Sequence, residues 1–186
     1  MIIIGITGTL GAGKGTIVDY LVKQKGFIHF SVRGFLIEEI KKQKMEVNRD
    51  SMTSVANHLR TQNSPSYIID QLYKQAIEKG KNCIIESIRT EGEINSLREK
   101  ENFYLLAVNA ERKTRFDRIK LRKSETDHVS YDTFMQNEKR EFESTDPNKQ
   151  NLKRCIELAD FVLLNNGSLS DLTAQIEQIM NQIIKS

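Results

Sequence analysis

Near its N-terminus the chain reads Gly8-Thr9-Leu10-Gly11-Ala12-Gly13-Lys14-Gly15-Thr16, between an apolar run rich in β-branched residues and a segment with helical periodicity. Glycines let a backbone curl around a phosphate with its N–H groups pointing inward, in conformations that a Cβ would obstruct. The helix N-terminus adds a partial positive charge to the full charge of Lys14, and Thr16 offers a hydroxyl for phosphate or for Mg²⁺ bound to it. The sequence therefore predicts a P-loop that binds ATP and Mg²⁺ through Gly8, Gly11, Ala12, Gly13, Lys14, Gly15 and Thr16.

Apolar runs that suit strands alternate with longer helix-period segments along the rest of the chain. Such alternation implies a parallel sheet with helices on both faces. The expected fold class is therefore α/β, a P-loop NTPase fold with a five-stranded parallel sheet flanked by helices. The fourth helix is expected to begin at Ser64-Pro65, an N-cap followed by proline at the first helical position. Strands are expected at residues 2–7, 27–30, 82–86, 103–109 and 161–164, and helices at residues 14–25, 35–45, 51–62, 65–79, 91–100, 112–121, 131–143, 152–158 and 169–184.

The domain organisation is expected to be simple. With two prolines, ten glycines and no low-complexity tract, residues 1–186 are interpreted as one domain without an interdomain linker. Within it, residues 31–80 form a long helical insertion between the second and third expected strands. Residues 122–132 are polar and charged with almost no apolar side chains, and we interpret them as a small lid.

Bulk composition argues against several classes of function. The net charge of +3, from 28 basic and 25 acidic residues, is too balanced for a generic nucleic-acid binder. No segment approaches the roughly 20 apolar residues of a membrane span, and the opening run lacks the basic region of a signal peptide. Cys83 and Cys155 lie far apart in the sequence and are expected to be reduced, in a cytoplasmic protein. Three scattered histidines complete no metal pattern, so a structural zinc site is not expected. The oligomeric state stays open.

The P-loop has the form Gly-x-x-Gly-x-Gly-Lys-Gly-Thr, in which a glycine separates the lysine from the threonine. This form resembles adenylate kinase and related nucleoside monophosphate kinases. The block Lys25-Gly26-Phe27-Ile28-His29-Phe30-Ser31 is similar to the segment that leads a strand into their acceptor-nucleotide site. The chain departs from them at Gly34 and Ile37, where they typically have an aspartate and an arginine that grips the AMP phosphate. The resemblance implies an ATP-dependent nucleotide kinase with Ser31 at its acceptor site.

Three later blocks resemble other members of this superfamily more closely. They are similar to dephospho-CoA kinase-like proteins, archaeal adenylate-kinase-like proteins and kinase-like segments associated with deoxycytidylate deaminases. The blocks are Asn57-x-Leu59-Arg60, Ile84-Ile85-Glu86-Ser87-Ile88-Arg89 and Ala159-Asp160-Phe161-Val162-Leu163-Leu164-Asn165-Asn166-Gly167-Ser168. By resemblance to the loop whose backbone contacts adenine in these kinases, Asn165 and Gly167 are candidate cofactor-binding residues.

Two candidate catalytic residues, Glu86 and Arg89, follow a strand expected at the centre of the sheet. Doubly wound sheets bind ligands at the carboxyl ends of their strands. A carboxylate there can order the waters of Mg²⁺ or accept a proton from an acceptor hydroxyl. An arginine there can clamp an acceptor phosphate through two hydrogen bonds. Glu86 is thus a candidate metal ligand as well, and Arg89 a candidate substrate-binding residue.

Further arginines occur in the insertion and beside the expected lid. In the related kinases the insertion covers the acceptor, which makes Arg33 and Arg60 candidate substrate-binding residues, with Arg49 a weaker candidate. Arg115, Arg118 and Arg122 share one face of the helix expected at residues 112–121, because they are spaced i, i+3 and i+7. Arg118 and Arg122 resemble the lid arginines that neutralise the transferring phosphoryl group, which makes them candidate catalytic residues. Arg140 is a further candidate. Arg115 is expected at the surface.

Other nucleotide-binding classes fit the sequence less well. Asn148-Lys149 matches only the first two letters of the Asn-Lys-x-Asp that reads guanine in GTPases. The run Ile84-Ile85-Glu86-Ser87 lacks the paired Asp-Glu of an AAA-type Walker B strand, which argues against a motor ATPase. Three functions remain open. The first is a kinase of a ribo- or deoxynucleoside monophosphate, and the second is a dephospho-CoA kinase-like enzyme whose hydroxyl acceptor needs a base such as Glu86. The third is a nucleotide-binding sensor or regulator with little turnover. The expected partner is a small-molecule nucleotide, with no membrane and no nucleic acid.

Overall fold

Five parallel strands form one sheet in the order β2-β3-β1-β4-β5, with the first strand at its centre. The computed structural model describes residues 1–100, 102–122 and 130–185. The pairing register runs from Ile3↔Cys83 to Ile6↔Glu86 between β1 and β3. The expected α/β fold with a five-stranded parallel sheet is confirmed. The strands are β1 (Ile3–Gly8), β2 (Ile28–Ser31), β3 (Cys83–Glu86), β4 (Phe103–Asn109) and β5 (Phe161–Leu164).

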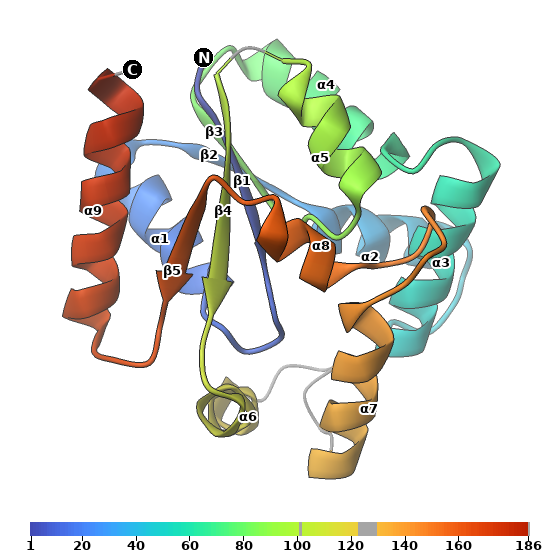
Figure 1. Ribbon diagram of the computed structural model, residues 1–186. Helices are drawn as coiled ribbons and strands as arrows, with labels where there is room; N and C mark the ends of the chain where they lie inside the picture. The colour runs from blue at the N-terminus through green and yellow to red at the C-terminus, as the bar shows by residue number, and fades with distance from the viewer. Residues whose placement is uncertain (101, 123–129, 186) are drawn as a thin grey trace.

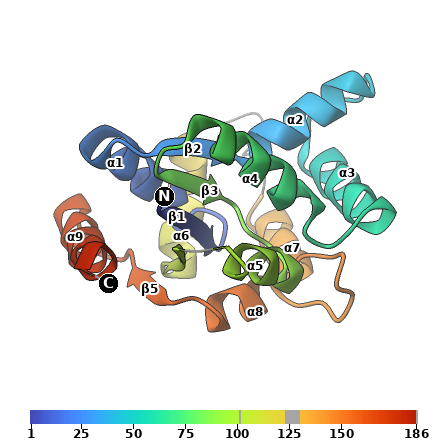
Figure 2. The ribbon, with the colours of Figure 1, turned by 90° about the horizontal axis from the view of Figure 1, so that it is seen from above.

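Helices cover both faces of the sheet (Figures 1 and 2). On one side lie α1 and α9, and on the other lie α4, α5 and α8, with α2 and α3 farther out and α6 and α7 below the carboxyl ends of the strands (Figure 1). The helices described are α1 (Lys14–Lys25), α2 (Val32–Lys42), α3 (Arg49–Gln62), α4 (Tyr67–Lys79), α5 (Glu91–Arg98), α6 (Arg112–Arg122), α7 (Tyr131–Phe142), α8 (Leu152–Glu157) and α9 (Leu169–Lys185).

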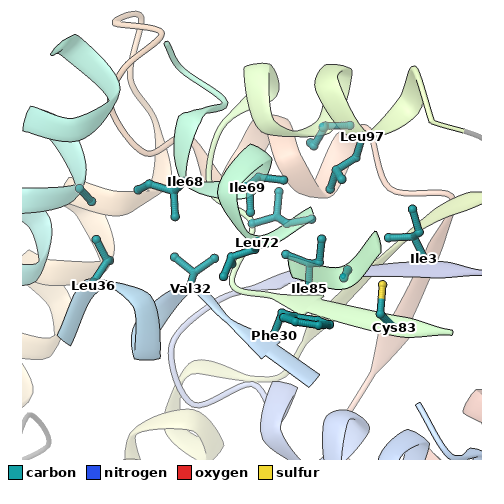
Figure 3. Close-up of a cluster of buried hydrophobic side chains, with 14 of the residues drawn as sticks. Ile3, Phe30, Val32, Leu36, Ile68, Ile69, Leu72, Cys83, Ile85 and Leu97 are labelled. Carbon is teal, nitrogen blue, oxygen red and sulfur yellow. The ribbon is translucent and has the colours of Figure 1, made fainter. Parts of the chain in front are cut away.

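The central strands are apolar on both faces because each face is covered by helices. Successive residues of a strand point to opposite sides, so Ile4 packs with α1 and α9, whereas Ile3 packs with α4 and α5. Figure 3 shows the second of these cores, where Ile85 of β3 meets Leu72 of α4 and Val32 of α2. Burial of these side chains packs the sheet against its helices. This packing fixes the strand ends from which the functional loops start.

Three expected helix starts are corrected by the structure. The second helix begins at Val32 and not at residue 35, because the Ser31 side chain caps it by accepting a hydrogen bond from the Gly34 N–H at 3.1 Å. The third helix begins at Arg49 and not at residue 51, because the Asn48 side chain caps it. The fourth helix begins at Tyr67, two residues after Pro65. Pro65 lies instead in the preceding turn, where its carbonyl accepts a hydrogen bond from the Thr90 hydroxyl at 3.3 Å. The contact with the start of α5 outweighs the preference of proline for the first helical position.

The chain leaves the sheet toward one common edge. The P-loop follows β1, the loop with Arg89 follows Glu86 at the end of β3, and α6 follows β4. Because parallel strands end at the same edge, these three connections lie close together there. Within the described residues, no helix is both long and apolar enough to cross a membrane.

Candidate functional site

The P-loop between β1 and α1 has the backbone conformation of a phosphate cradle. Gly8, Gly11 and Gly13 have φ values of 143°, 78° and 108°, which side-chain-bearing residues rarely adopt. A Cβ on Gly8 would lie 2.2 Å from the Val108 carbonyl oxygen. On Gly13 it would lie 2.2 Å from the Asn165 side-chain nitrogen. The loop therefore depends on these glycines both for its curvature and for its close contact with neighbouring loops.

Several backbone donors of the P-loop are not used within the described part of the protein. The N–H groups of Gly13, Lys14 and Gly15 at the start of α1 have no acceptor within the part of the chain that the structure describes. The Lys14 ammonium folds back onto the loop and donates to the carbonyl oxygens of Gly8 and Thr9, at 2.9 and 3.0 Å. Unpaired N–H groups at a helix N-terminus beside a lysine are the donor set that binds a phosphate chain. The residues present therefore fit the triphosphate of a nucleotide.

The charge of Lys14 is sensitive to its surroundings. Burial, and next the nearby Arg89 guanidinium, lower the pKa of Lys14 from its ordinary value of 10.5 to about 7, against the opposing effect of Glu86 and Glu141. Polyphosphate contacts favour the charged form of the amine and therefore raise this pKa again. Binding of a nucleotide triphosphate should consequently be coupled to protonation of Lys14.

This coupling predicts proton uptake when MgATP binds. At pH 8 a Lys14 whose pKa is about 7 is mostly neutral before binding and charged afterwards, so roughly one proton is taken up per site and affinity falls as pH rises above 7. Calorimetric titrations at pH 8 in two buffers with different ionisation enthalpies measure this number. The Lys14→Met variant should show almost no uptake. Equal binding heats in both buffers for the unmodified protein would contradict the assignment.

A single cavity of about 680 Å³ connects the P-loop to the helical insertion. Its wall is formed by the P-loop and α1 on one side, by α2 and α3 on the other, and by the loop after β3 between them. The volume suits two small-molecule ligands or one extended ligand. Of the residues expected from the sequence, the cavity is lined by Gly11, Gly13, Lys14, Gly15, Thr16, Arg33, Arg60, Glu86, Arg89, Arg118 and Arg122.

Two arginines in this wall converge on one carboxylate. Glu141 of α7 accepts hydrogen bonds from Arg49 at 2.5 Å and from Arg89 at 3.0 Å, one on each oxygen. The Glu141 residue is only 4% exposed. Its burial by itself would raise the pKa of Glu141, but Arg89 and Arg49 together hold that pKa below its ordinary value. The three side chains thus form a charged cluster at neutral pH on the wall of the cavity.

The Arg60 guanidinium is held inside the protein by another carboxylate. Its Nε and one Nη donate to the same Glu93 oxygen, at 3.1 and 2.8 Å. The other Glu93 oxygen accepts from the backbone N–H groups of Arg89 and Thr90, at 2.7 and 3.1 Å. The remaining nitrogen, Arg60 Nη1, is buried without a partner in the described residues. Arg60 therefore has one nitrogen, Nη1, that is not engaged by Glu93, and Glu93 fixes the backbone that carries Arg89.

The acid at the end of β3 has two polar neighbours. Glu86 accepts a hydrogen bond from the Ser87 hydroxyl at 2.6 Å, and its other oxygen lies 3.9 Å from His29 Nε2. Ser87 has a φ of 76°, a strained value for a residue with a side chain. The turn that follows β3 is therefore held in a costly conformation at the place where Glu86 and Arg89 enter the cavity.

Thr16 and Glu86 fit a magnesium ion whose remaining ligands come from elsewhere. Both line the same cavity, and both offer the oxygen donors that Mg²⁺ prefers. Among residues 1–100, 102–122 and 130–185, no group of three or more acidic, histidine or cysteine side chains could hold a metal ion. Such a site would therefore take most of its ligands from nucleotide phosphates and water, as Mg²⁺ commonly does.

Comparison with known proteins agrees with this geometry. Residues 4–146 match the family model described as AAA domain, AAA_18. The chain belongs to this AAA-domain family. β3 nevertheless ends in the single acid Glu86, without the paired acids expected of an AAA-type motor. Related sequences include a UPF0200 protein of Methanococcus vannielii, 30% identical over 99% of this chain and 97% of that protein. The UPF0200 protein TK1334 of Thermococcus kodakarensis is 26% identical over 99% of this chain and 98% of its own.

Solved structures with this fold include two small-molecule kinases. The gluconokinase of Sinorhizobium meliloti superposes with a TM-score of 0.58 at 12% identity, covering 100% of this chain and 97% of its own. The shikimate kinase of Bacteroides thetaiotaomicron superposes with a TM-score of 0.52 at 13% identity and covers 98% of each chain. At these identities the likeness concerns the fold. This member of the AAA-domain family thus has a P-loop fold that it shares with these kinases.

Several expected site residues of this family member lie away from the cavity wall. The Ser31 hydroxyl caps α2, and Arg140 of α7 pairs with Asp50 at 2.8 Å, so neither lines the cavity. Asn165 is buried beside the P-loop, where it donates to the Ala12 carbonyl at 2.9 Å. Its side-chain oxygen also lies 3.5 Å from Arg118. Gly8, Ala12 and Gly167 do not line the cavity either, and of the lid expected at 122–132, residues 123–129 lie outside the described residues.

The expectation that Arg115 lies at the surface is wrong. Arg115 is 4% exposed and donates to the carbonyl oxygens of Leu10 and Ala110 and to Glu138. It also lies over the ring of Phe134, 5.5 Å from the centroid. Because it contacts the P-loop from α6 and reaches α7, Arg115 joins three elements in the interior. Its neighbour Arg118 does line the cavity, with a buried Nη1 that has no partner in the described part of the chain.

Sequence reasoning missed Glu141, Glu93, His29 and Gln150. A signal for Glu141 exists, since it stands seven residues after Phe134 on the buried face of α7, where a carboxylate needs a partner. Glu93 is three residues after Thr90 and completes a capping box, which was also visible in the sequence. Nothing local marks Gln150, whose buried side-chain oxygen lacks a partner among the residues described.

Proposed function

We propose that this protein is an ATP-dependent phosphotransferase that acts on a small nucleotide, with a ribo- or deoxynucleoside monophosphate as the first candidate. The observation that carries the proposal is the cavity that continues from the P-loop to the arginines of the insertion. A donor nucleotide at the P-loop and an acceptor below α2 and α3 would then share one enclosure, as direct transfer between them requires.

The charges of the cavity wall support two anionic ligands. Seven basic residues line it against three acidic ones, Asp19, Glu86 and Glu141. Two of the acids are close to arginine or histidine, and Arg60 is paired with Glu93 behind the wall, but the lining as a whole carries more positive than negative charge. The basic residues are Lys14, Arg33, Arg49, Arg60, Arg89, Arg118 and Arg122. Nucleotide phosphates on both donor and acceptor would balance this excess.

In the proposed reaction the protein positions the phosphates and neutralises their charge, which is most of what phosphoryl transfer requires. Lys14 leaves its two carbonyl partners and binds the outer phosphates of ATP. Arg118 and Arg122 approach the transferring phosphoryl group from α6, and Arg89 orients the acceptor. Thr16 and Glu86 would hold Mg²⁺, which neutralises charge on the phosphate oxygens when it is bound. Asn165 and Gly167 are proposed to contact the adenine side of the nucleotide.

A hydroxyl acceptor, as in a dephospho-CoA kinase-like enzyme, is the second candidate. Its support is Glu86, a carboxylate on the cavity wall with His29 3.9 Å away, which could accept the proton of an acceptor hydroxyl. A phosphate acceptor is already ionised and needs no base. The number of arginines in the wall favours the phosphate acceptor over the hydroxyl acceptor. A sensor with little turnover would bind ATP without either reaction.

The test is ADP formation from MgATP with a panel of ribo- and deoxynucleoside monophosphates and dephospho-CoA. One monophosphate that stimulates ADP formation well above the rate without acceptor would establish the kinase and its substrate class. Stimulation by dephospho-CoA alone would select the hydroxyl acceptor. A flat panel together with calorimetric ATP binding would refute the kinase and support the sensor.

Gln150 is expected to contribute to acceptor binding. Gln150 lines the cavity and its buried Oε1 has no partner in the described residues, so we expect a donor on the acceptor to satisfy it. Gln150→Leu should raise the KM for the acceptor roughly 2- to 12-fold. This factor corresponds to the loss of one hydrogen bond that contributes about 0.5–1.5 kcal/mol to binding. The KM for ATP should not change. Gln24→Leu, on the exposed face of α1, is the matched control. An equal rise of both KM values would place Gln150 outside the acceptor site.

A further inference from the structure

The contact between Glu141 and its two arginines joins three separate elements at the wall of the cavity. Arg49 comes from the first turn of α3, Arg89 from the loop after β3, and Glu141 from the last turns of α7. All three line the cavity together with Lys14. The Glu141 carboxylate is thus a protein anion inserted between two cavity-lining cations that come from different parts of the chain.

Other parts of the wall are less suited to hold an acceptor anion. Arg60 gives two of its three nitrogens to Glu93 and is only 2% exposed. Arg49 and Arg89 keep unused donors, because each spends one nitrogen on Glu141, and Arg49 Nε is buried without a partner in the described residues. Two guanidinium groups that converge on one carboxylate can bind a phosphate in the same manner. Arg49 and Arg89 are therefore a pair of cavity-lining arginines that already converges on one anion.

The helix that carries Glu141 is attached by aromatic contacts at its start, where Tyr131 and Phe134 meet Phe116 of α6, and by charged contacts farther along. Phe134 is the one apolar side chain of described α7 residues that is buried. Besides Glu141, the helix is held by Glu138, which pairs with Arg115 and Arg112, and by Arg140, which pairs with Asp50. In Figure 1, α7 lies below α3 and away from the sheet. The aromatic contacts thus lie at the start of α7, and a shift of its other end that withdraws Glu141 is opposed mainly by ion pairs.

We propose that Arg49 and Arg89 form the binding subsite for the phosphate of the acceptor and that Glu141 is an internal ligand which this phosphate displaces. The proposal rests on the acceptor site of the proposed function. Glu141 offsets part of the charge of the two half-buried arginines while the subsite holds no substrate, and it competes with every anion that enters. The exchange replaces one carboxylate by one phosphate monoester and leaves the arginines paired throughout.

The decisive measurement is calorimetric binding of inorganic phosphate and of AMP and dCMP, with the P-loop filled by a non-hydrolysable ATP analogue and Mg²⁺. Removing the competitor by Glu141→Gln should strengthen binding of inorganic phosphate and of at least one monophosphate by tenfold or more. Arg49→Gln should weaken it by a similar factor. The matched control Glu143→Gln, two residues farther along and exposed, should leave binding unchanged. Adenosine and deoxycytidine, which lack the phosphate, should not gain affinity from Glu141→Gln.

Weaker or unchanged phosphate binding by Glu141→Gln would overturn the proposal, because Glu141 would then position the arginines without competing. If this variant does not fold, hydrogen exchange of the unmodified protein decides. Phosphate should then increase amide exchange in residues 131–142, and unchanged or slower exchange there would refute displacement. Since neither readout needs turnover, a flat ADP panel with tenfold tighter phosphate binding would refute the kinase and retain the subsite.

Discussion

Lys14→Ala is expected to reduce acceptor-dependent ADP formation by roughly 100- to 1,000-fold or more, which is the usual loss when one preorganised charge on a developing anion is removed. The physical reason is that Lys14 is the ammonium group nearest the unpaired N–H groups of the P-loop. The measurement is steady-state ADP formation with the acceptor that the panel identifies, at saturating MgATP.

The matched control is Lys153→Ala, which removes an exposed lysine of α8 that pairs with Glu143. It should retain full activity. Circular dichroism and the melting temperature should show that Lys14→Ala is folded, because among the described residues the Lys14 ammonium bonds only to the loop carbonyl oxygens of Gly8 and Thr9. Retained turnover in folded Lys14→Ala protein would refute the P-loop scheme.

Glu93→Gln is expected to cause the largest loss of stability. The side chains of Arg60 and Glu93 are 1% and 0% exposed, so removing the negative charge leaves a buried guanidinium uncompensated. Breaking a buried ion pair in this way costs about 3–5 kcal/mol of the free energy of unfolding. For a chain of this length the melting temperature should fall by roughly 6–20 °C. Chemical denaturation and thermal melting measure the two quantities.

Glu38→Gln, an exposed glutamate on α2, is the control for this substitution and should change stability by less than about 0.5 kcal/mol. If Glu93→Gln behaves like that control, Arg60 is not held by Glu93 in the folded protein. Arg60 would then be available to a ligand, and the assignment of the anion subsite to Arg49 and Arg89 would have to be revised.

The P-loop, the sheet and most helices could be predicted because their signals are local. Nine consecutive residues from Gly8 to Thr16 encode both the glycines of the loop and its charge, and each strand is a short apolar run bounded by polar residues. Among the helix starts that were wrong, that of α2 depends on a local cap by Ser31, whereas that of α4 depends on a contact that the local pattern does not contain. Pro65 is placed by Thr90, 25 residues away, and no pattern around Pro65 reports this.

The arginines could be found from the sequence, but their partners could not. Arg60 was expected to hold substrate, yet Glu93, 33 residues away, engages two of its three nitrogens. Arg115 shares a helix face with Arg118. It can be buried because Glu138 and the P-loop carbonyl of Leu10 accept hydrogen bonds from its guanidinium group. Ion pairs between distant segments follow from the tertiary fold, so sequence spacing identifies the charged residues without showing which of them remain available to a ligand.

The central claim is that a phosphoryl group passes directly from ATP to an acceptor in the cavity between the P-loop and the arginines of the insertion. The most direct test is incubation with ATP labelled in its γ-phosphate, followed by separation of all labelled products. The account predicts that label appears in a nucleoside diphosphate formed from the added monophosphate, in step with ADP. Label that appears only in inorganic phosphate, or stays in ATP with every acceptor, would contradict it.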